Sequence, residues 1–161
     1  QEKYLTKSGV LNFEASVEAF EEIKAANNNV TAIFNAANGQ IAALALVKGF
    51  RFKNALMEEH FNENYAESDQ YPKAIFKGEL VGFSLDSLQT SYTINGTLSF
   101  HGITKPLENV SVEVKSSGNS FTLQGTFEIT PNDFDIEIPK IVSSKIADSV
   151  GVVFEFELTE K

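Results

Sequence analysis

Most of this 161-residue sequence alternates apolar and polar side chains with a period of two. The pattern is clear between residues 91 and 130, where Val110, Val112 and Val114 alternate with polar residues. Successive side chains of a β-strand point to opposite faces, so the alternation predicts strands with one buried and one solvated face. The sequence therefore predicts an all-β chain with eight strands, at residues 8–16, 29–37, 41–52, 73–82, 92–101, 110–115, 119–130 and 150–159.

One segment, residues 54–65, departs from this period. Its large side chains recur every three or four positions, which places five of them on one side of a helix: Leu56, Met57, His60, Phe61 and Tyr65. Asn54 is predicted to cap this helix, because its side-chain oxygen can accept a hydrogen bond from the first turn. Pro72 disfavours helical geometry at Tyr71, so a strand should follow. We expect one short amphipathic helix inserted into the sheet.

Two other segments lack a clear strand pattern. Residues 17–26 have a weak helical spacing that stops at the three asparagines 27–29, which predicts a short helical turn or an irregular arm. Residues 131–149 form the longest stretch without strand character, and such loops are usually functional or cover a site. Asn38-Gly39 is a strong hairpin signal. No linker or repeat divides the chain, so we expect one domain over residues 1–161.

The amino-acid composition restricts the classes of function that this chain can have. The chain has 14 Phe, one Met and no Trp, and these rings either fill an ordinary core or line a space for a hydrocarbon chain. The absence of Cys excludes disulfides and thiolate metal sites. The net charge of −9 disfavours nucleic acid and anionic membrane surfaces as partners. No apolar run approaches the roughly 18 residues of a membrane span.

Three separated segments carry a family resemblance: LMEEHFNENYAESDQYPKAIFKG at 56–78, GTLSFHGITKP at 96–106 and NDFDIEIP at 132–139. In this order they resemble the YceI-like family of bacterial periplasmic or secreted proteins. The resemblance covers nearly the whole chain. It implies a lipocalin-like antiparallel β-barrel that binds a long amphiphile such as a polyisoprenoid in its interior. It also implies export with removal of a signal peptide, and it suggests dimers with adjoining barrels.

An eight-stranded barrel is just wide enough to enclose one small ligand or its own side chains. For a hollow barrel, we expect inward strand residues to line the cavity, with Met57 and Phe61 over one opening. The strand residues in this set are Phe13, Phe34, Leu46, Phe50, Phe76, Ile94, Leu98, Phe100, Phe127 and Phe154. The candidate partners of a phosphate headgroup are Arg51, Lys53, Lys105 and Lys140, although the negative net charge disfavours an anionic ligand.

The leading hypothesis is the binding, transport or storage of an isoprenoid or fatty-acid-like lipid without enzymatic activity. The alternative is a stress-response or interaction protein with a barrel filled by side chains and an outer surface that binds a partner. This alternative follows from residues 41–52, which are apolar on both faces. Something must cover their outer face, and the helix at 54–65 is a candidate, although it would equally serve at a barrel end.

An enzymatic hypothesis depends on few residues. His60 with Glu63 is the one acid and base pair that the pattern offers, and His101 is predicted to be a turn residue. Asp133 and Asp135 are more typical of a turn than of a cation site. We therefore expect no catalytic residue, no metal site and no cofactor.

Overall fold

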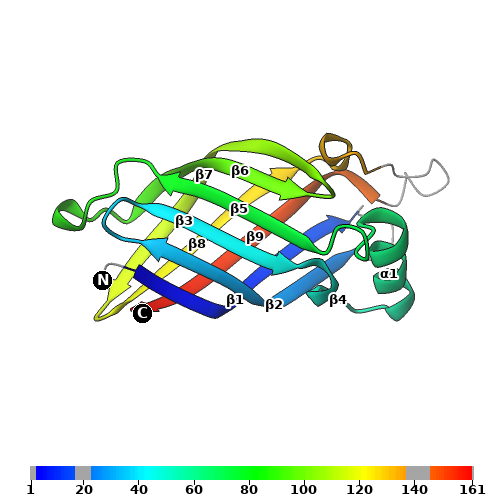
Figure 1. The fold of residues 1–161 in the computed structure, drawn as a ribbon, viewed down its shortest axis with the longest axis horizontal. Coiled ribbons are helices and arrows are strands. Elements are labelled where there is room, and N and C mark those ends of the chain that lie inside the picture. Colours follow the sequence, from blue (N-terminus) through cyan, green and yellow to red (C-terminus); the bar gives the residue numbers. More distant parts are fainter. Residues whose placement is uncertain (1–2, 17–22, 137–145, 161) are drawn as a thin grey trace.

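The computed structural model describes residues 3–16, 23–136 and 146–160, with the backbone alone for residues 146–148. These residues form a closed antiparallel β-barrel with one short helical segment at one end (Figure 1). The strands are β1 (Lys3–Ser16), β2 (Lys24–Asn35), β3 (Gln40–Leu46), β4 (Arg51–Phe52), β5 (Lys73–Leu80), β6 (Ser91–Phe100), β7 (Ile103–Ser117), β8 (Ser120–Ile129) and β9 (Ile146–Glu160).

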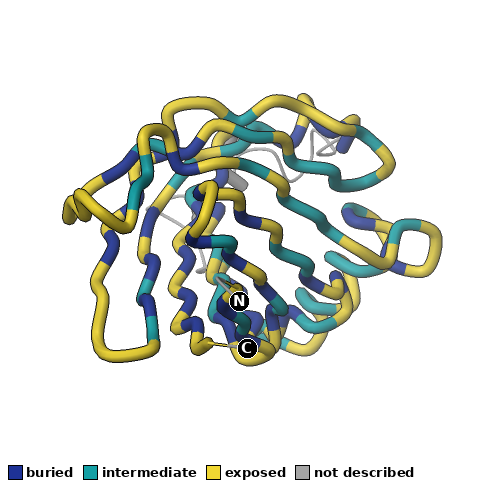
Figure 2. The backbone as a smooth tube through the Cα atoms, turned by 60° about the vertical axis from the view of Figure 1, so that its left-hand side comes forward, coloured by how far each residue is buried: buried dark blue, intermediate teal, exposed yellow. Residues whose placement is uncertain are grey.

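The strand order around the barrel is β1-β9-β8-β7-β6-β5-β3-β2, and pairing of β1 with β2 closes it. The two-residue strand β4 follows β3 after the 3-10 turn Val47–Gly49 and also pairs with β2. Since β3 and β4 both border β2, the barrel has eight strand positions around its wall. This confirms the predicted eight-stranded antiparallel barrel. Figure 2 shows buried and exposed residues alternating along the strands.

Strand β2 begins earlier than the sequence pattern predicted. Residues 24–26 were expected in a helical turn or irregular arm, but Ala25 pairs with Phe13 of β1. Asn27, expected to stop a helix, is 1% exposed and supports the strand instead. Its Nδ2 donates to the carbonyl of Leu46 at 3.1 Å, and its Oδ1 accepts from the amide of Asn29 at 2.9 Å. Pairing with β1 therefore overrides the local spacing; residues 17–22 of this prediction lie outside the described residues.

The predicted helix is confirmed and lies at one end of the barrel. Helix α1 (Ala55–His60) continues into the π-helical turn η2 (Phe61–Tyr65), where the Ala66 amide donates to the Phe61 carbonyl. As expected, Asn54 caps α1, because its Oδ1 accepts from the amides of Leu56 and Met57 at 2.8 and 3.2 Å. No helix in the described part of the chain is long and apolar enough to cross a membrane.

The helix leaves the outer face of β3 open. Ile41, Ala45 and Val47 are the buried residues here, so the opposite set on β3 faces outward. Leu46 belongs to that set and is 55% exposed. The prediction that Leu46 faces the interior is therefore wrong. Both faces of this strand are apolar, so alternation alone did not distinguish them.

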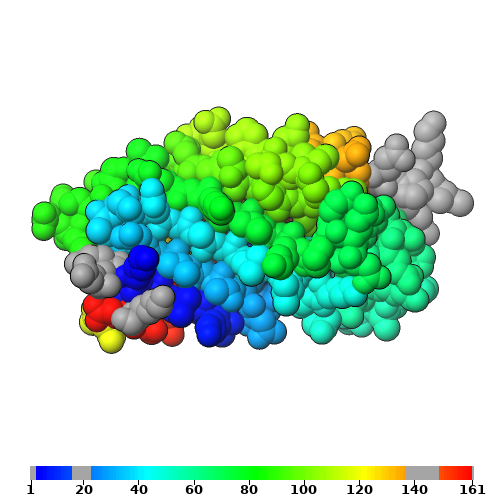
Figure 3. Space-filling view, viewed as in Figure 1, coloured from blue at the N-terminus to red at the C-terminus, as the bar shows by residue number. Residues whose placement is uncertain are grey.

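The loops at the two barrel ends differ. The predicted Asn38-Gly39 hairpin turn is present, and Gly39 adopts a positive φ of 78° between β2 and β3. The β5–β6 connection contains the 3-10 turn Leu85–Ser87 and projects from the end opposite α1 (Figures 1 and 3). The predicted long loop begins with the 3-10 turn η4 (Pro131–Phe134), on the same side as α1. Residues 137–145 of this loop lie outside the described part.

An aromatic cluster fills the barrel end opposite α1, called here the closed end. It consists of Tyr4, Phe34, Phe83, Tyr92 and Phe121. The ring of Phe34 lies 5.0 Å from that of Phe83 and 5.6 Å from that of Phe121, measured between centroids. Phe34 has no exposed surface. Edge-to-face and tilted aromatic contacts therefore fill this end with side chains.

Candidate ligand cavity

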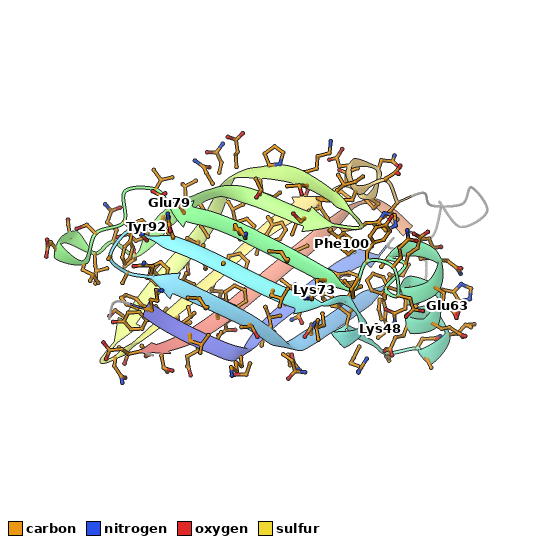
Figure 4. All side chains as sticks on the ribbon, in the orientation of Figure 1. Lys48, Glu63, Lys73, Glu79, Tyr92 and Phe100 are labelled. Carbon is orange, nitrogen blue, oxygen red and sulfur yellow. The ribbon has the colours of Figure 1, made fainter. Side chains whose placement is uncertain are left out.

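The end that carries α1, called here the open end, contains a cavity of about 470 Å³. Its walls are strands of the barrel and the inner side of α1 and η2. The volume falls within the roughly 300 to 1,000 Å³ of typical small-molecule sites. The predicted cavity residues that line it are Phe13, Phe50, Met57, Phe61, Leu98, Phe100 and Phe127. Figure 4 shows Phe100 at this end and Tyr92 at the opposite one.

A smaller cavity of about 60 Å³ lies next to the large one, on the side of the barrel core. Four residues line both spaces, namely Leu11, Ala74, Leu98 and Phe127. The predicted residues Phe76, Ile94 and Phe154 line only the smaller space. The shared residues make the two spaces neighbours, so the inner one extends the apolar region from the open end into the barrel.

Phe34 and Leu46 are the predicted cavity residues that line neither space. Phe34 does face inward, but its ring packs in the aromatic cluster of the closed end. Leu46 lies on the outer face of the barrel, as described above. Alternation assigned Phe34 to the correct face but contained no information on its depth along the barrel.

Some cavity residues were not among the predicted set. Leu11, Ile129 and Val152 lie on strands that the alternation identified, but they are smaller than the phenylalanines that were selected. Pro131 and Ile136 line the cavity from the segment at η4, which has no periodic signal in the sequence. The contribution of this segment follows only from the fold, which places it beside the open end.

The large cavity is lined by a few polar side chains and no charged one among the described residues. The polar ones are Asn54, His60 and Tyr65, all from the helical segment or its cap. Asn54 Oδ1 is already engaged in capping α1. Desolvation by burial raises the pKa of the Tyr65 phenol above its usual 10.0. Tyr65 therefore stays neutral over the physiological range and can act as a hydrogen-bond donor or acceptor at the cavity wall.

None of the described candidates for a phosphate headgroup lines the cavity. Arg51 is mostly exposed, and its Nη1 donates to the Lys48 carbonyl at 2.8 Å and approaches Glu58 Oε2 at 3.5 Å. Lys53 and Lys105 are exposed. Lys140 lies outside the described residues. The described walls thus offer hydrogen bonds but no lysine or arginine to a ligand.

The geometry gives little support to the enzymatic hypothesis. His60 Nδ1 lies 3.4 Å from Asn64 Nδ2, and no hydrogen bond or ion pair joins His60 to Glu63. Within the described ranges, no cluster of three or more His, Asp and Glu side chains is arranged to hold a metal ion. Asp135 adopts a positive φ of 58° at the end of η4, as expected of a turn residue.

His101 has more contacts than a turn residue needs. Its Nδ1 lies 2.8 Å from the carbonyl oxygen of Phe134, and its Nε2 lies 3.3 Å from Glu67 Oε2. Its ring also packs against Tyr71, with centroids 4.7 Å apart. His101 therefore joins the β6–β7 turn, the η4 turn and the segment after η2, three regions that are distant in sequence.

The fold and the cavity together define an antiparallel, lipocalin-like β-barrel that is filled at one end and hollow and apolar at the other. The model of the YceI-like domain family matches residues 6–158. The chain therefore belongs to the YceI-like family. Comparison with curated proteins finds no match.

Solved structures support the fold assignment. A polyisoprenoid binding domain from Saccharophagus degradans, implicated in plant cell wall breakdown, superposes with a TM-score of 0.82 at 15% identity, covering 99% of both chains. BcnA from Burkholderia cenocepacia gives 0.77 at 19% identity, with 94% of this chain and 96% of that chain covered. The YCEI protein of Campylobacter jejuni gives 0.72 at 16% identity, covering 88% and 87%. At these identities the likeness establishes the shared barrel.

Proposed function

We propose that this protein binds the apolar chain of one amphiphilic lipid in the cavity of the open end and carries or stores it without chemical change. The observation that supports this most directly is the cavity of about 470 Å³, lined by phenylalanine and aliphatic side chains. Burial of a hydrocarbon chain contributes roughly 0.8 kcal/mol per methylene, so a long chain binds with few polar contacts.

The comparisons make a polyisoprenoid the first candidate for this lipid. The Saccharophagus degradans domain of the same fold is described as polyisoprenoid binding. Membership of the YceI-like family agrees with this choice. We also infer that the protein acts in the periplasm or outside the cell, in line with the family that the sequence motifs resemble.

The ligand's headgroup is expected to be uncharged. The described walls present the side chains of Asn54, His60 and Tyr65 and no lysine or arginine. A phosphate held here would lack a lysine or arginine partner among the described residues, and the net charge of −9 opposes its approach. A hydroxyl or carbonyl headgroup, in contrast, can exchange hydrogen bonds with these side chains.

The experiment is native mass spectrometry of protein purified from its own host, followed by solvent extraction of the bound material. We expect one lipid per barrel, with an uncharged headgroup. Reconstitution with a prenyl alcohol and with its phosphate, in parallel, then compares the two headgroups on the same chain length. Empty protein that also fails to bind either added lipid would refute the proposal.

The alternative of an interaction protein has one observation in its favour. Ile33 and Leu46 are exposed on the outer face of neighbouring strands, at 38% and 55%. However, that hypothesis requires a barrel filled by side chains, and only the closed end is filled. The extraction experiment separates the two hypotheses, because a barrel filled by side chains would release no lipid.

A further inference from the structure

We propose that His101 is a positioning residue of the open end, which in its protonated form holds the two sides of the cavity together and slows ligand exchange. The inference depends on the proposed lipid binding for its ligand, but the contacts that it concerns are visible in the protein itself. We call His101, Glu67, Tyr71 and Phe134 the His101 junction.

The junction connects two walls of the cavity. On one side, Glu67 and Tyr71 follow η2, whose residues Phe61 and Tyr65 line the cavity. On the other side, the carbonyl of Phe134 belongs to η4, and Pro131 and Ile136 of this segment also line the cavity. The phenyl ring of Phe134 packs on Phe100, another lining residue, with centroids 5.9 Å apart. A change at His101 therefore acts on both walls.

The two hydrogen-bond partners of His101 are both acceptors. A backbone carbonyl such as that of Phe134 has no proton to donate, so the bond of 2.8 Å requires a proton on Nδ1. The carboxylate of Glu67 accepts only, so the contact of 3.3 Å requires a proton on Nε2. A neutral imidazole carries one proton and satisfies one partner. The imidazolium satisfies both, and its bond to Glu67 is charge-assisted.

Histidine is the side chain that commonly changes charge between about pH 5 and 8. The titratable groups in contact with the ring are Glu67 and Tyr71 on the helical side, and Asp133 and Asp135 flank Phe134 in the sequence. Both contacts are therefore present at the lower pH. As pH rises and one proton leaves, the longer bond to Glu67 is lost and the two walls are no longer joined through the ring.

Backbone geometry at the junction supports a functional role. Three of the four non-glycine residues with positive φ in the described part of the chain lie in the junction or directly after Phe134: Glu67 at 49°, His101 at 54° and Asp135 at 58°. Aspartate and histidine tolerate this left-handed region better than most residues, whereas glutamate is uncommon there. The Tyr71 ring covers Gly102, where an added Cβ would lie 2.7 Å from Tyr71 Cε1. Left-handed turns from three separate segments therefore lie around one imidazole.

The test measures ligand release at two pH values with an uncharged probe. N-phenyl-1-naphthylamine is loaded into the protein, and its release into excess phosphatidylcholine vesicles is followed by fluorescence at about pH 5.5 and 8. We expect release about tenfold slower at the lower pH, the effect of one charge-assisted hydrogen bond. Glu67→Gln should abolish the pH dependence, because an amide either donates to or accepts from the imidazole. Equal release of the wild-type protein at both pH values would overturn the proposal.

Two controls separate this effect from others. Glu63→Gln changes an exposed carboxylate in η2 outside the junction and should keep the wild-type pH dependence. His60→Gln removes the other histidine and should also keep it, whatever its effect on affinity. If either control loses the dependence while Glu67→Gln keeps it, the assignment to His101 is wrong.

A second measurement is independent of the ligand. In the empty protein, NMR of labelled histidine should show protons on both nitrogens of His101 at the lower pH. Amide exchange in residues 132–136, corrected for its intrinsic pH dependence, should be slower at the lower pH than at the higher one. This difference should vanish in Glu67→Gln. A probe that does not bind at all would refute lipid binding, while the exchange result would still decide on the junction. Unchanged exchange would refute the junction alone.

Discussion

The two ends of the barrel contain the same kind of side chain and use it differently. At the closed end, Phe34 and Phe121 are buried and surrounded by other rings. At the open end, the rings of Phe13, Phe50 and Phe61 also touch one another, with centroids 5.1 to 6.1 Å apart, but they line a cavity. Aromatic contacts by themselves therefore do not determine whether a barrel interior is filled or contains a cavity.

The difference follows from the segment inserted at each end. At the closed end, Phe83 of the β5–β6 connection places its ring against Phe34, Tyr92 and Phe121. At the open end, α1 and η2 span the rim, so Phe61 contacts Phe13, Phe50 and Phe52 near the wall. The Phe83 ring enters the barrel interior and fills it, whereas α1 and η2 lie across the rim and cover the cavity.

The largest expected effect concerns stability at the closed end. Phe34→Ala removes a fully buried ring and should lower the free energy of unfolding by about 3 to 5 kcal/mol. Phe61→Ala removes a ring that is only partly buried and faces the cavity, so its cost should be less than half as large. Chemical denaturation of both variants checks this. Equal losses would show that the two ends are packed alike.

The second prediction concerns binding. Ala74 lines both cavities, so the larger side chain of Ala74→Leu should take up space where they adjoin and weaken lipid binding by about tenfold or more. The matched control is Ala42→Leu, a change of the same size on the exposed outer face of β3. Titration with a fluorescent lipid compares the two variants. Equal affinities would mean that the ligand does not extend past Ala74.

These two ends also show how much the sequence could predict. Alternation predicted that the strands exist because each has a solvated and a buried face, as in β7, where Val110, Val112 and Val114 are buried. It missed the first half of this strand, which begins at Ile103 and not at the predicted residue 110. It failed at Leu46, where both faces are apolar and register depends on pairing of β3 with its neighbours. It correctly predicted that Phe34 faces inward. It could not predict the position of Phe34 along the barrel axis, because a period of two distinguishes only the two faces of a strand.

The site itself was predictable only in part. The phenylalanine content and the amphipathic spacing of Met57 and Phe61 indicated a covered apolar space. The roles of Ile136 and Pro131 were not predictable, since they lie in a segment without periodicity. His101 was predicted to be a turn residue, which its φ of 54° agrees with, but its partners Glu67 and Phe134 lie more than thirty residues away. Such contacts follow from barrel closure and not from local pattern.

The third prediction tests whether the cap of α1 affects only the open end. Asn54→Ala removes the acceptor of the Leu56 and Met57 amides and should cost about 1 kcal/mol of stability. Asn54→Ser keeps a capping oxygen and should lose much less. Amide exchange should increase in residues 55–65 and remain unchanged around Phe34. An increase at both ends would indicate that the barrel opens as one cooperative unit.

The smallest effect is expected at Tyr65. Burial raises the pKa of its phenol above 10.0, because the folded protein favours the neutral form. This group's contribution to stability is therefore full below about pH 10 and is lost as pH rises through the folded-state pKa. A lipid in the cavity excludes further water and should raise the pKa again. Absorbance titration at 295 nm, with Tyr65→Phe to assign the transition, measures both shifts. A pKa that lipid leaves unchanged would place the bound chain away from Tyr65, deeper toward Ala74.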